Sequence, residues 1–231
     1  MLKGITLDVG GTLAEGGLDK KAFMASAVDY LRGLGHGVDE KSYRRALGRA
    51  MNKLEKLRAS GRDMYFHDFY SLVLSGLGIR PQDEILDGLL ELYFKHFIST
   101  PVPGMREVIE ELASSYALAV ISNAVSPWPR RFLEREGLAR YFEAIVISGE
   151  VGWKKPHRRI FEEALSRLGL EPWEVAHVGD SPEDDVMGAR NIGMKAILVL
   201  RPGRSPLVLE EADAVIGSLS ELPEALKRLD P

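Results

Sequence analysis

Two acidic side chains follow short apolar runs of β-forming residues, at positions where a strand would end. Asp8 comes directly after residues 5–7, and Asp180 comes shortly after residues 175–178. Mg²⁺ in proteins prefers carboxylate, carbonyl and water oxygens. The sequence contains no cysteine, which excludes thiolate metal ligands and thiolate nucleophiles. Asp8 and Asp180 therefore predict a magnesium site with oxygen ligands.

The segment after Asp8 predicts a turn that can approach an anion. Gly10 and Gly11 leave space for a ligand beside the backbone, and successive amides in such a turn can form a concave anion-binding nest. Thr12 adds a hydroxyl group to the same segment. A strand-ending Asp followed by Gly is also ordinary turn chemistry, so this interpretation depends on the other residues of the site.

Three further polar residues occupy comparable positions. Ser122 and Asn123 follow the apolar residues 117–121, and their side chains can donate hydrogen bonds to a phosphate, although such residues also serve as helix N-caps. Lys155 precedes a proline and a helix-forming segment. An ammonium group at this position could neutralise a nucleophile and a phosphate together.

The alternation of strand and helix patterns predicts a doubly wound α/β fold with a parallel, Rossmann-like sheet. The apolar runs are short, as in strands buried on both faces of a sheet, and helical patterns separate them after residue 104. Ligand sites in such folds lie beyond the carboxyl ends of the strands. The predicted strands are residues 5–9, 117–122, 144–148, 175–178, 196–200 and 214–216, and the predicted helices are residues 105–115, 127–136, 157–168 and 184–193.

Residues 15–98 predict an α-helical cap domain inserted into this core. The segment contains several amphipathic helical stretches and no convincing strand. The core would then consist of residues 1–14 and 99–231. Residues 15–17 contain two glycines and residues 99–104 are rich in turn formers, so both linkers are expected to act as hinges.

Together these motifs resemble the haloacid dehalogenase superfamily. Its four motifs occur in order, and the resemblance covers residues 1–14 and most of the chain after residue 99, with the inserted segment similar to the cap of one large branch of the superfamily. The matching residues are Asp8 with Gly11 and Thr12, Ser122 with Asn123, Lys155 with Pro156, and Gly179, Asp180 and Ser181 with Asp185.

The resemblance implies a magnesium-dependent hydrolase that acts on a small phosphorylated metabolite. Asp8 would attack phosphorus to form an aspartyl-phosphate, and Lys155 would stabilise the developing charge. The implied phosphate-binding residues are Gly11, Thr12, Ser122, Asn123 and Lys155. The implied metal ligands are Asp8, the backbone carbonyl of Gly10, Asp180 and Asp185, with Asp184 as the alternative to Asp185 if the loop register differs by one residue.

One position departs from the pattern of the resembled phosphatases. They typically carry a second Asp two residues after the nucleophile, which protonates the leaving oxygen and then activates water, and this chain has Gly10. General acid–base catalysis contributes about 10²–10⁴-fold in rate. We therefore expect alkyl phosphate esters to be poor substrates, whereas acyl and aryl phosphates need the proton less.

The histidines provide no obvious replacement for the missing acid. His36, His67 and His96 lie in the predicted cap, and no spacing favours one of them. His177 lies within a predicted strand and is expected to be a packed core residue. Glu183 to Asp185 can also be explained as acids that complement a helix dipole without any function, which we adopt for Glu183.

Two other functions are compatible with Gly10. A 2-haloacid dehalogenase also lacks the second Asp and expels a halide, which needs no proton, but such enzymes work without magnesium and the acidic segment 179–185 resembles the metal-binding version. A phosphate-binding protein that has lost efficient turnover is the second alternative. A magnesium-dependent phosphatase fits the whole set of residues best.

Composition and charge narrow the remaining choices. The formal net charge of -4 gives no indication of nucleic-acid binding, and no apolar run approaches the roughly 20 residues of a membrane-spanning helix. No secretory leader precedes the first strand, so we expect a cytoplasmic protein. The expected partner is a small-molecule substrate, without a role for nucleic acid or membrane.

The predicted cap contains a basic stretch and several aromatic residues. Residues 41–62 carry eight basic side chains and one acidic one, which could steer anions toward the site. We favour a solvated helix face, because Leu47, Met51 and Leu54 form a separate apolar stripe. The aromatic residues at 65–66, 69–70 and 93–94 are expected to form the core of the cap, and some could line its crevice.

Overall fold

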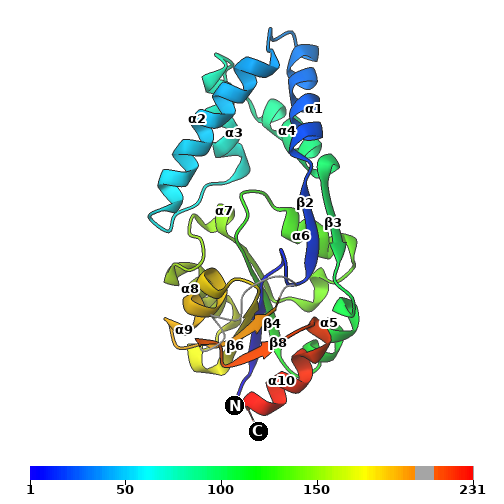
Figure 1. The fold of residues 1–231 in the computed structure, drawn as a ribbon, viewed down its shortest axis with the longest axis vertical. Coiled ribbons are helices and arrows are strands. Elements are labelled where there is room, and N and C mark those ends of the chain that lie inside the picture. The colour runs from blue at the N-terminus through cyan, green and yellow to red at the C-terminus, as the bar shows by residue number, and fades with distance from the viewer. Residues whose placement is uncertain (201–210, 231) are drawn as a thin grey trace.

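A parallel sheet forms the centre of the lower half of the molecule in the computed structural model, which describes residues 1–200 and 211–230 (Figure 1). The strand order is β5-β4-β1-β6-β7-β8, and each neighbouring pair is parallel. The winding changes direction at β1, between β4 and β6. The predicted doubly wound fold is confirmed. The strands are β1 (Gly4–Leu7), β4 (Ala117–Ser122), β5 (Ala144–Ile147), β6 (Val175–Gly179), β7 (Lys195–Val199) and β8 (Ala214–Ile216).

Helices cover both faces of this sheet because alternate residues of each strand point to opposite sides. In β4, Leu118 and Val120 pack with α5, α6 and α10, whereas Ala119 and Ile121 pack with α8 and α9. Figure 1 shows α8 and α9 on one side of the sheet and α5 and α10 on the other. The helices are α5 (Met105–Ala113), α6 (Trp128–Arg135), α7 (Ser148–Val151), α8 (Arg158–Leu168), α9 (Gly188–Arg190) and α10 (Leu222–Leu229), with short 3₁₀ turns at Ala139–Tyr141, Pro172–Glu174 and Leu219–Glu221.

The helical insertion, which we define as helices α1 to α4, lies at the opposite end of the molecule (Figure 1). These helices bury a separate apolar cluster, in which α1 packs against α4 and α2 against α3. Asp39 begins α2 with a capping box, since its carboxylate accepts a hydrogen bond from the Ser42 amide at 2.6 Å. None of the described helices is long and apolar enough to cross a membrane. The four helices are α1 (Lys20–Gly33), α2 (Glu40–Arg58), α3 (Phe66–Gly76) and α4 (Asp83–His96).

The two linkers to the insertion are strands, and the prediction that residues 15–98 contain no strand was wrong. β2 (Ala14–Leu18) and β3 (Phe97–Pro101) form an antiparallel two-stranded ribbon. Gly16 has a φ of 116°, and a Cβ at this position would collide with the carbonyl of Ile98. Gly16 thus permits close pairing of two distant segments, which a local sequence pattern does not reveal.

The segment after β6 is also different from the predicted helix over residues 184–193. It begins earlier, as a π-helix (Pro182–Met187), and continues as α9. The carboxylate of Asp185 turns back toward the strand end and accepts a hydrogen bond from the Ser181 amide at 2.9 Å. A Cβ on Gly179 would collide with this carboxylate. The wide π turn therefore places Asp185 over the end of β6.

Candidate active site

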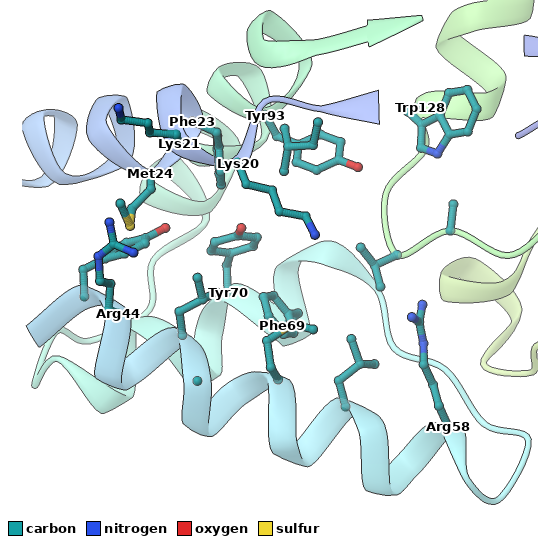
Figure 2. A pocket seen from close by; sticks show the side chains of 18 of the residues that line it. Lys20, Lys21, Phe23, Met24, Arg44, Arg58, Phe69, Tyr70, Tyr93 and Trp128 are labelled. Carbon is teal, nitrogen blue, oxygen red and sulfur yellow. The ribbon is translucent and has the colours of Figure 1, made fainter. Parts of the chain in front are cut away.

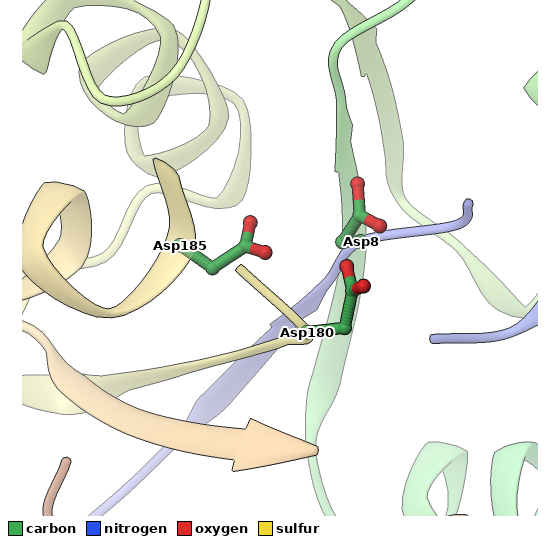
Figure 3. Close-up of side chains that lie close together, drawn as sticks. All are labelled: Asp8, Asp180 and Asp185. Atoms are coloured by element: carbon green, nitrogen blue, oxygen red, sulfur yellow. The ribbon is translucent and has the colours of Figure 1, made fainter. Parts of the chain in front are cut away.

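Asp8 lies at the topological switch point of the sheet, one residue after the end of β1. Its amide donates a hydrogen bond to the carbonyl of Val178 in the neighbouring strand at 2.9 Å, and its side chain is buried. Asp180 follows β6, and Asp185 is on the π-helix. Figure 3 shows the three carboxylates converging from these three segments. One oxygen of each lies within 4.8 Å of the others.

Lys155 is buried against this cluster. Its Nζ lies 2.7 Å from Asp8 Oδ1, 2.6 Å from Asp185 Oδ1 and 2.7 Å from the carbonyl oxygen of Ile121. Burial alone would favour the neutral amine, but the two carboxylates raise the pKa of Lys155 above its ordinary value. The side chain is therefore an ammonium group held between the two aspartates.

Three buried carboxylates and one ammonium group leave an excess of negative charge at the site. Burial is the main cause that raises the pKa of Asp8 to about 7, and Asp185 and Asp180 add to it while Lys155 opposes it. Burial also disfavours ionised Asp185, but Lys155 and His177 hold its pKa below the usual range. A divalent cation would balance this charge, and the oxygen donors match the preference of Mg²⁺. The residues fit a magnesium ion.

Asn123 and Asp184 bind each other beside the cluster. The Asn123 amide donates to Asp184 Oδ2 and to the carbonyl oxygen of Lys155, both at 3.1 Å, and its Oδ1 accepts from the Lys155 amide at 2.8 Å. The structure thus uses the Asn123 side chain to position the backbone of Lys155. Asp184 pairs with Lys154 at 3.3 Å, and Asp185 rather than Asp184 enters the carboxylate cluster.

A small cavity of about 140 Å³ opens beside Asp8. Gly10, Ser122 and Trp128 line it together with the residues of the cluster. The predicted phosphate-binding residues Gly11 and Thr12 do not line this cavity. The remaining lining residues are Asn123, Lys155, Asp180, Ser181, Asp184 and Asp185.

Backbone hydrogen bonds hold the turn after Asp8 together. The amide of Gly11 donates to the carbonyl of Ala14 at 2.7 Å, and the amide of Thr12 donates to that of Val9 at 3.2 Å. The Thr12 hydroxyl is buried and has no hydrogen-bond partner among the described residues. The two amides thus close the turn, and phosphate binding by Gly11 and Thr12 stays a prediction.

His177 is buried, as predicted, but it also contacts the site. Its Nε2 lies 3.0 Å from Asp185 Oδ1, and its Nδ1 lies 2.8 Å from the Thr6 hydroxyl. Burial lowers the pKa of His177, which favours the neutral ring. Sequence reasoning missed this contact, although the parallel register of β1 and β6 pairs Thr6 with His177. None of His36, His67 and His96 lines the cavity beside Asp8.

Trp128 is a second residue that sequence reasoning missed. Its ring stacks on Phe97 of β3, with centroids 4.6 Å apart, and lines both the small cavity and a larger one of about 860 Å³ under the helical insertion. No local motif marks this tryptophan. Its position depends on the antiparallel ribbon, which brings Phe97 next to the first turn of α6.

The basic stretch of α2 is divided between two directions, since Arg44 and Arg58 line the large cavity and Arg45 and Arg49 do not. Arg45 and Arg49 are exposed and lie away from the large cavity, with Arg49 bound to the carbonyl of Gly76 at 2.7 Å. The solvated face that we expected for these two residues is confirmed. The apolar stripe of Leu47, Met51 and Leu54 lines the large cavity.

A Rossmann-like sheet with a carboxylate cluster and a buried lysine at its switch point, beneath a helical insertion, defines a class of α/β hydrolases. Residues 71–199 match the family model described as haloacid dehalogenase-like hydrolase. The chain belongs to this family, as the sequence motifs predicted, and it is a hydrolase.

Individual relatives cover the whole chain. It is 30% identical to the glyceraldehyde 3-phosphate phosphatase of Methanothermobacter thermautotrophicus, over 98% of this chain and 100% of the relative. A 2-haloacid dehalogenase structure from Pseudomonas syringae pv. tomato DC3000 is similar with a TM-score of 0.79 and 27% identity, covering 99% of each chain. A HAD phosphatase structure from Thermococcus onnurineus has a TM-score of 0.64 and 25% identity, covering 97% of this chain and 98% of the other.

Proposed function

We propose that this protein is a magnesium-dependent phosphatase that forms an aspartyl-phosphate at Asp8 and acts on a small phosphorylated molecule with a good leaving group. The observation that carries the proposal is the 2.7 Å contact between Lys155 and Asp8 beside two further buried carboxylates. The names of the curated relatives, which include glyceraldehyde 3-phosphate phosphatase, support a phosphate substrate.

Asp8 is the nucleophile in this proposal. Its ionised carboxylate attacks phosphorus, an oxygen–phosphorus bond forms, and the bond from phosphorus to the leaving oxygen breaks with its electron pair on that oxygen. Water then hydrolyses the aspartyl-phosphate and releases inorganic phosphate. Lys155 lies close enough to Asp8 to offset charge on the phosphoryl oxygens, and Ser122 lines the same cavity and can donate a hydrogen bond.

Asp8, Asp180, Asp185 and the carbonyl of Gly10 would hold Mg²⁺. When bound, the ion supplies positive charge that keeps the carboxylates ionised and neutralises the phosphate. His177 acts as a positioning residue in this arrangement because it holds Asp185 from behind, at 3.0 Å. Ligand-orienting contacts of this kind matter for metal affinity.

The helical insertion would act as a cap, with residues 15–98 as the cap domain. It lies beyond the carboxyl ends of the strands (Figure 1), and its helices line the larger cavity. The loop between α2 and α3 contacts the core directly, since Asp63 accepts a hydrogen bond from the Ser148 hydroxyl at 2.7 Å. An insertion in this position can exclude water before phosphoryl transfer.

Release of phosphate from p-nitrophenyl phosphate, measured with and without Mg²⁺, tests the proposal. The wild type should release phosphate only with the metal, and Asp8→Asn should reduce the rate by at least about a thousandfold. Phosphate release that survives Asp8→Asn would show that another group attacks phosphorus. The absence of any phosphate release with Mg²⁺ present would refute the proposed phosphatase activity.

A 2-haloacid dehalogenase is the second candidate, and two observations favour it. Gly10 provides no general acid, which a departing halide does not need, and the chain is similar in structure to the 2-haloacid dehalogenase from Pseudomonas syringae. Halide release from 2-chloropropionate without metal, in the absence of phosphatase activity, would establish it. If neither phosphate nor halide is released, a phosphate-binding protein is the better description.

A further inference from the structure

The larger cavity lies between the helical insertion and the loop that follows β4. Its volume is about 860 Å³, within the range of sites that enclose drug-sized ligands. Helices α1, α2, α3 and α4 each contribute side chains, and residues 123–125 with Trp128 provide the side that belongs to the core. Figure 2 shows Tyr70, Tyr93 and Trp128 around this space.

This cavity adjoins the candidate active site, because the two cavities share lining residues. Asn123 and Trp128 line both the large cavity and the small cavity beside Asp8. A phosphoryl group next to Asp8 would therefore have its leaving group directed past Trp128 into the large cavity. The residues that line the large cavity would then determine which leaving groups bind well.

The lining is apolar and rich in rings. Phe69, Tyr70 and Tyr93 come from α3 and α4, and Phe23 packs edge-on against Tyr70 and Tyr93 with centroids 5.9 and 5.8 Å apart. Such a surface favours another aromatic ring, in offset-stacked or edge-on contact. Two methionines, Met24 and Met51, add side chains that adapt to irregular shapes.

The charged residues that line the cavity are all basic. They are Lys20, Lys21, Arg44 and Arg58, and none of the described residues in the lining is acidic. Figure 2 shows Arg58 on the side of Trp128 and Arg44 at the far end. Arg58 is paired with Asp63 at 2.9 Å, and Arg44 lies 3.7 Å from Glu40. Lys20 and Lys21 are therefore the lining cations that form no ion pair with another described residue. An apolar space with these cations at its boundary attracts an apolar molecule that carries negative charge.

From these contacts we infer that the substrate is an aryl phosphate with a bulky leaving group of at least two fused or linked aromatic rings. The inference rests on the proposed phosphatase activity and specifies its substrate class. Two independent features agree on it: the large cavity accepts aromatic rings, and the loop at Gly10 lacks the acid that an alkoxide would require. A three-carbon sugar phosphate would leave most of the cavity empty.

Comparison of phenyl phosphate with 2-naphthyl phosphate tests this inference. The two leaving groups have similar acidity, so the second ring changes mainly the apolar contact. We expect kcat/KM to be larger for 2-naphthyl phosphate by roughly tenfold or more, because the additional ring carbons are buried. Acetyl phosphate has a small leaving group that does not enter the cavity, and it reports on the chemistry alone.

Gly48→Trp provides a variant that fills the cavity without touching the catalytic residues. Gly48 lines the cavity on α2, and a Cβ there meets no atom within 4 Å. We expect this variant to reduce kcat/KM for 2-naphthyl phosphate by about tenfold and to leave acetyl phosphate hydrolysis unchanged. Lys53→Trp, on the exposed side of the same helix, is the matched control and should change neither.

Met51→Glu is a second variant, in case Gly48→Trp does not fold. It places a carboxylate in the lining and should weaken 2-naphthyl phosphate hydrolysis selectively. Equal kcat/KM values for the two aryl phosphates, with no selective loss in either variant, would overturn the inference while acetyl phosphate hydrolysis upholds the proposed function.

Binding can be tested separately from turnover. If neither acetyl phosphate nor any aryl phosphate is hydrolysed, the proposed phosphatase activity is refuted, and calorimetric binding of 2-naphthylphosphonate then tests what the large cavity binds. Binding to the wild type that is lost in Gly48→Trp would still support an aromatic anion as the occupant. An absence of binding to the wild type would overturn it.

Discussion

Gly10 is the residue that determines which leaving groups the proposed enzyme can expel. Among the described residues, a Cβ at this position would meet only the Trp128 ring, at 3.6 Å, and the backbone of Gly10 is outside the left-handed region. An aspartate therefore fits. We expect Gly10→Asp to raise kcat/KM for alkyl esters such as glyceraldehyde 3-phosphate by about tenfold to a hundredfold more than for p-nitrophenyl phosphate.

Gly10→Asn is the matched control for this experiment, because the amide has the size of aspartate but cannot deliver the proton. If Gly10→Asp changes both substrates equally, or lowers both rates, the absent acid does not limit this enzyme. A similar gain in Gly10→Asn would assign the effect to packing against Trp128.

A variant of His177 tests whether its hydrogen bond to Asp185 contributes to the affinity for magnesium. The variant His177→Phe removes the hydrogen bond to buried Asp185. We expect the Mg²⁺ concentration for half-maximal activity to rise by about 10–100-fold, with most of the activity recovered at saturating Mg²⁺. An unchanged Mg²⁺ titration together with a lower free energy of unfolding would mean that His177 only packs the core.

At the residue scale the sequence predicted those positions that a strand end defines. Asp8, Ser122 and Asp180 follow strands β1, β4 and β6, or close them, and parallel strands bring their carboxyl ends to one edge. The position of Trp128 could not be predicted, because its ring stacks on Phe97 in a distant segment.

At the scale of elements, the loop from α2 to α3 is attached to α7. Asp63 is buried and binds the Arg58 guanidinium at 2.9 and 3.0 Å and the Ser148 hydroxyl at 2.7 Å. The nearby Asp63 amide donates to the carbonyl of Gly152 at 3.1 Å. These contacts connect the helical insertion to the segment that leads to Lys155.

We expect Asp63→Ala to lower the free energy of unfolding by about 2–4 kcal/mol, because it removes a buried charged partner and its hydrogen bonds. Chemical denaturation measures this value. Glu40→Ala removes an exposed carboxylate that lies 3.7 Å from Arg44 and should cost less than about 1 kcal/mol. Similar values for both variants would mean that the contact between Asp63 and Ser148 adds nothing to stability.

The sequence did not predict the two-stranded ribbon or the π-helix, because local side-chain patterns reveal neither. The ribbon pairs residues 14–18 with 97–101, across the whole helical insertion, and contains glycines that weaken a local strand pattern. The π-helix is defined by backbone hydrogen bonds five residues apart, such as that from the Val186 amide to the Ser181 carbonyl at 3.2 Å, which the side-chain pattern of residues 182–187 does not reveal. Buried strands, by contrast, were visible because they are short runs of mostly apolar, β-forming residues.

On the scale of the whole molecule, folding of the sheet brings the three carboxylates of the cluster together. Asp8, Asp180 and Asp185 come from three segments whose folding brings like charges together. A bound Mg²⁺ favours the folded state that gathers these ligands. The sequence predicted both the core and the insertion, but not how the helices enclose the larger cavity, since that depends on side chains from four helices.

Magnesium should therefore stabilise the protein. At a concentration of 100 times its dissociation constant, the ion should add about 2.7 kcal/mol to the free energy of unfolding, and a chelator should reverse the effect. Thermal or chemical unfolding with and without Mg²⁺ measures it, and Asp180→Asn should reduce the shift. Equal stabilisation of the wild type and the variant would place the ion elsewhere.

The covalent state of Asp8 is the most direct test of the proposed chemistry. The wild type is mixed with acetyl phosphate and Mg²⁺, quenched in acid, and its N-terminal peptide is analysed by mass spectrometry. We expect one phosphoryl group on Asp8 that requires Mg²⁺ and is absent from Asp8→Asn. Multiple turnovers of phosphate release with no phosphorylated Asp8 at any quench time, or with the phosphoryl group on another residue, would contradict the role of Asp8 as the nucleophile.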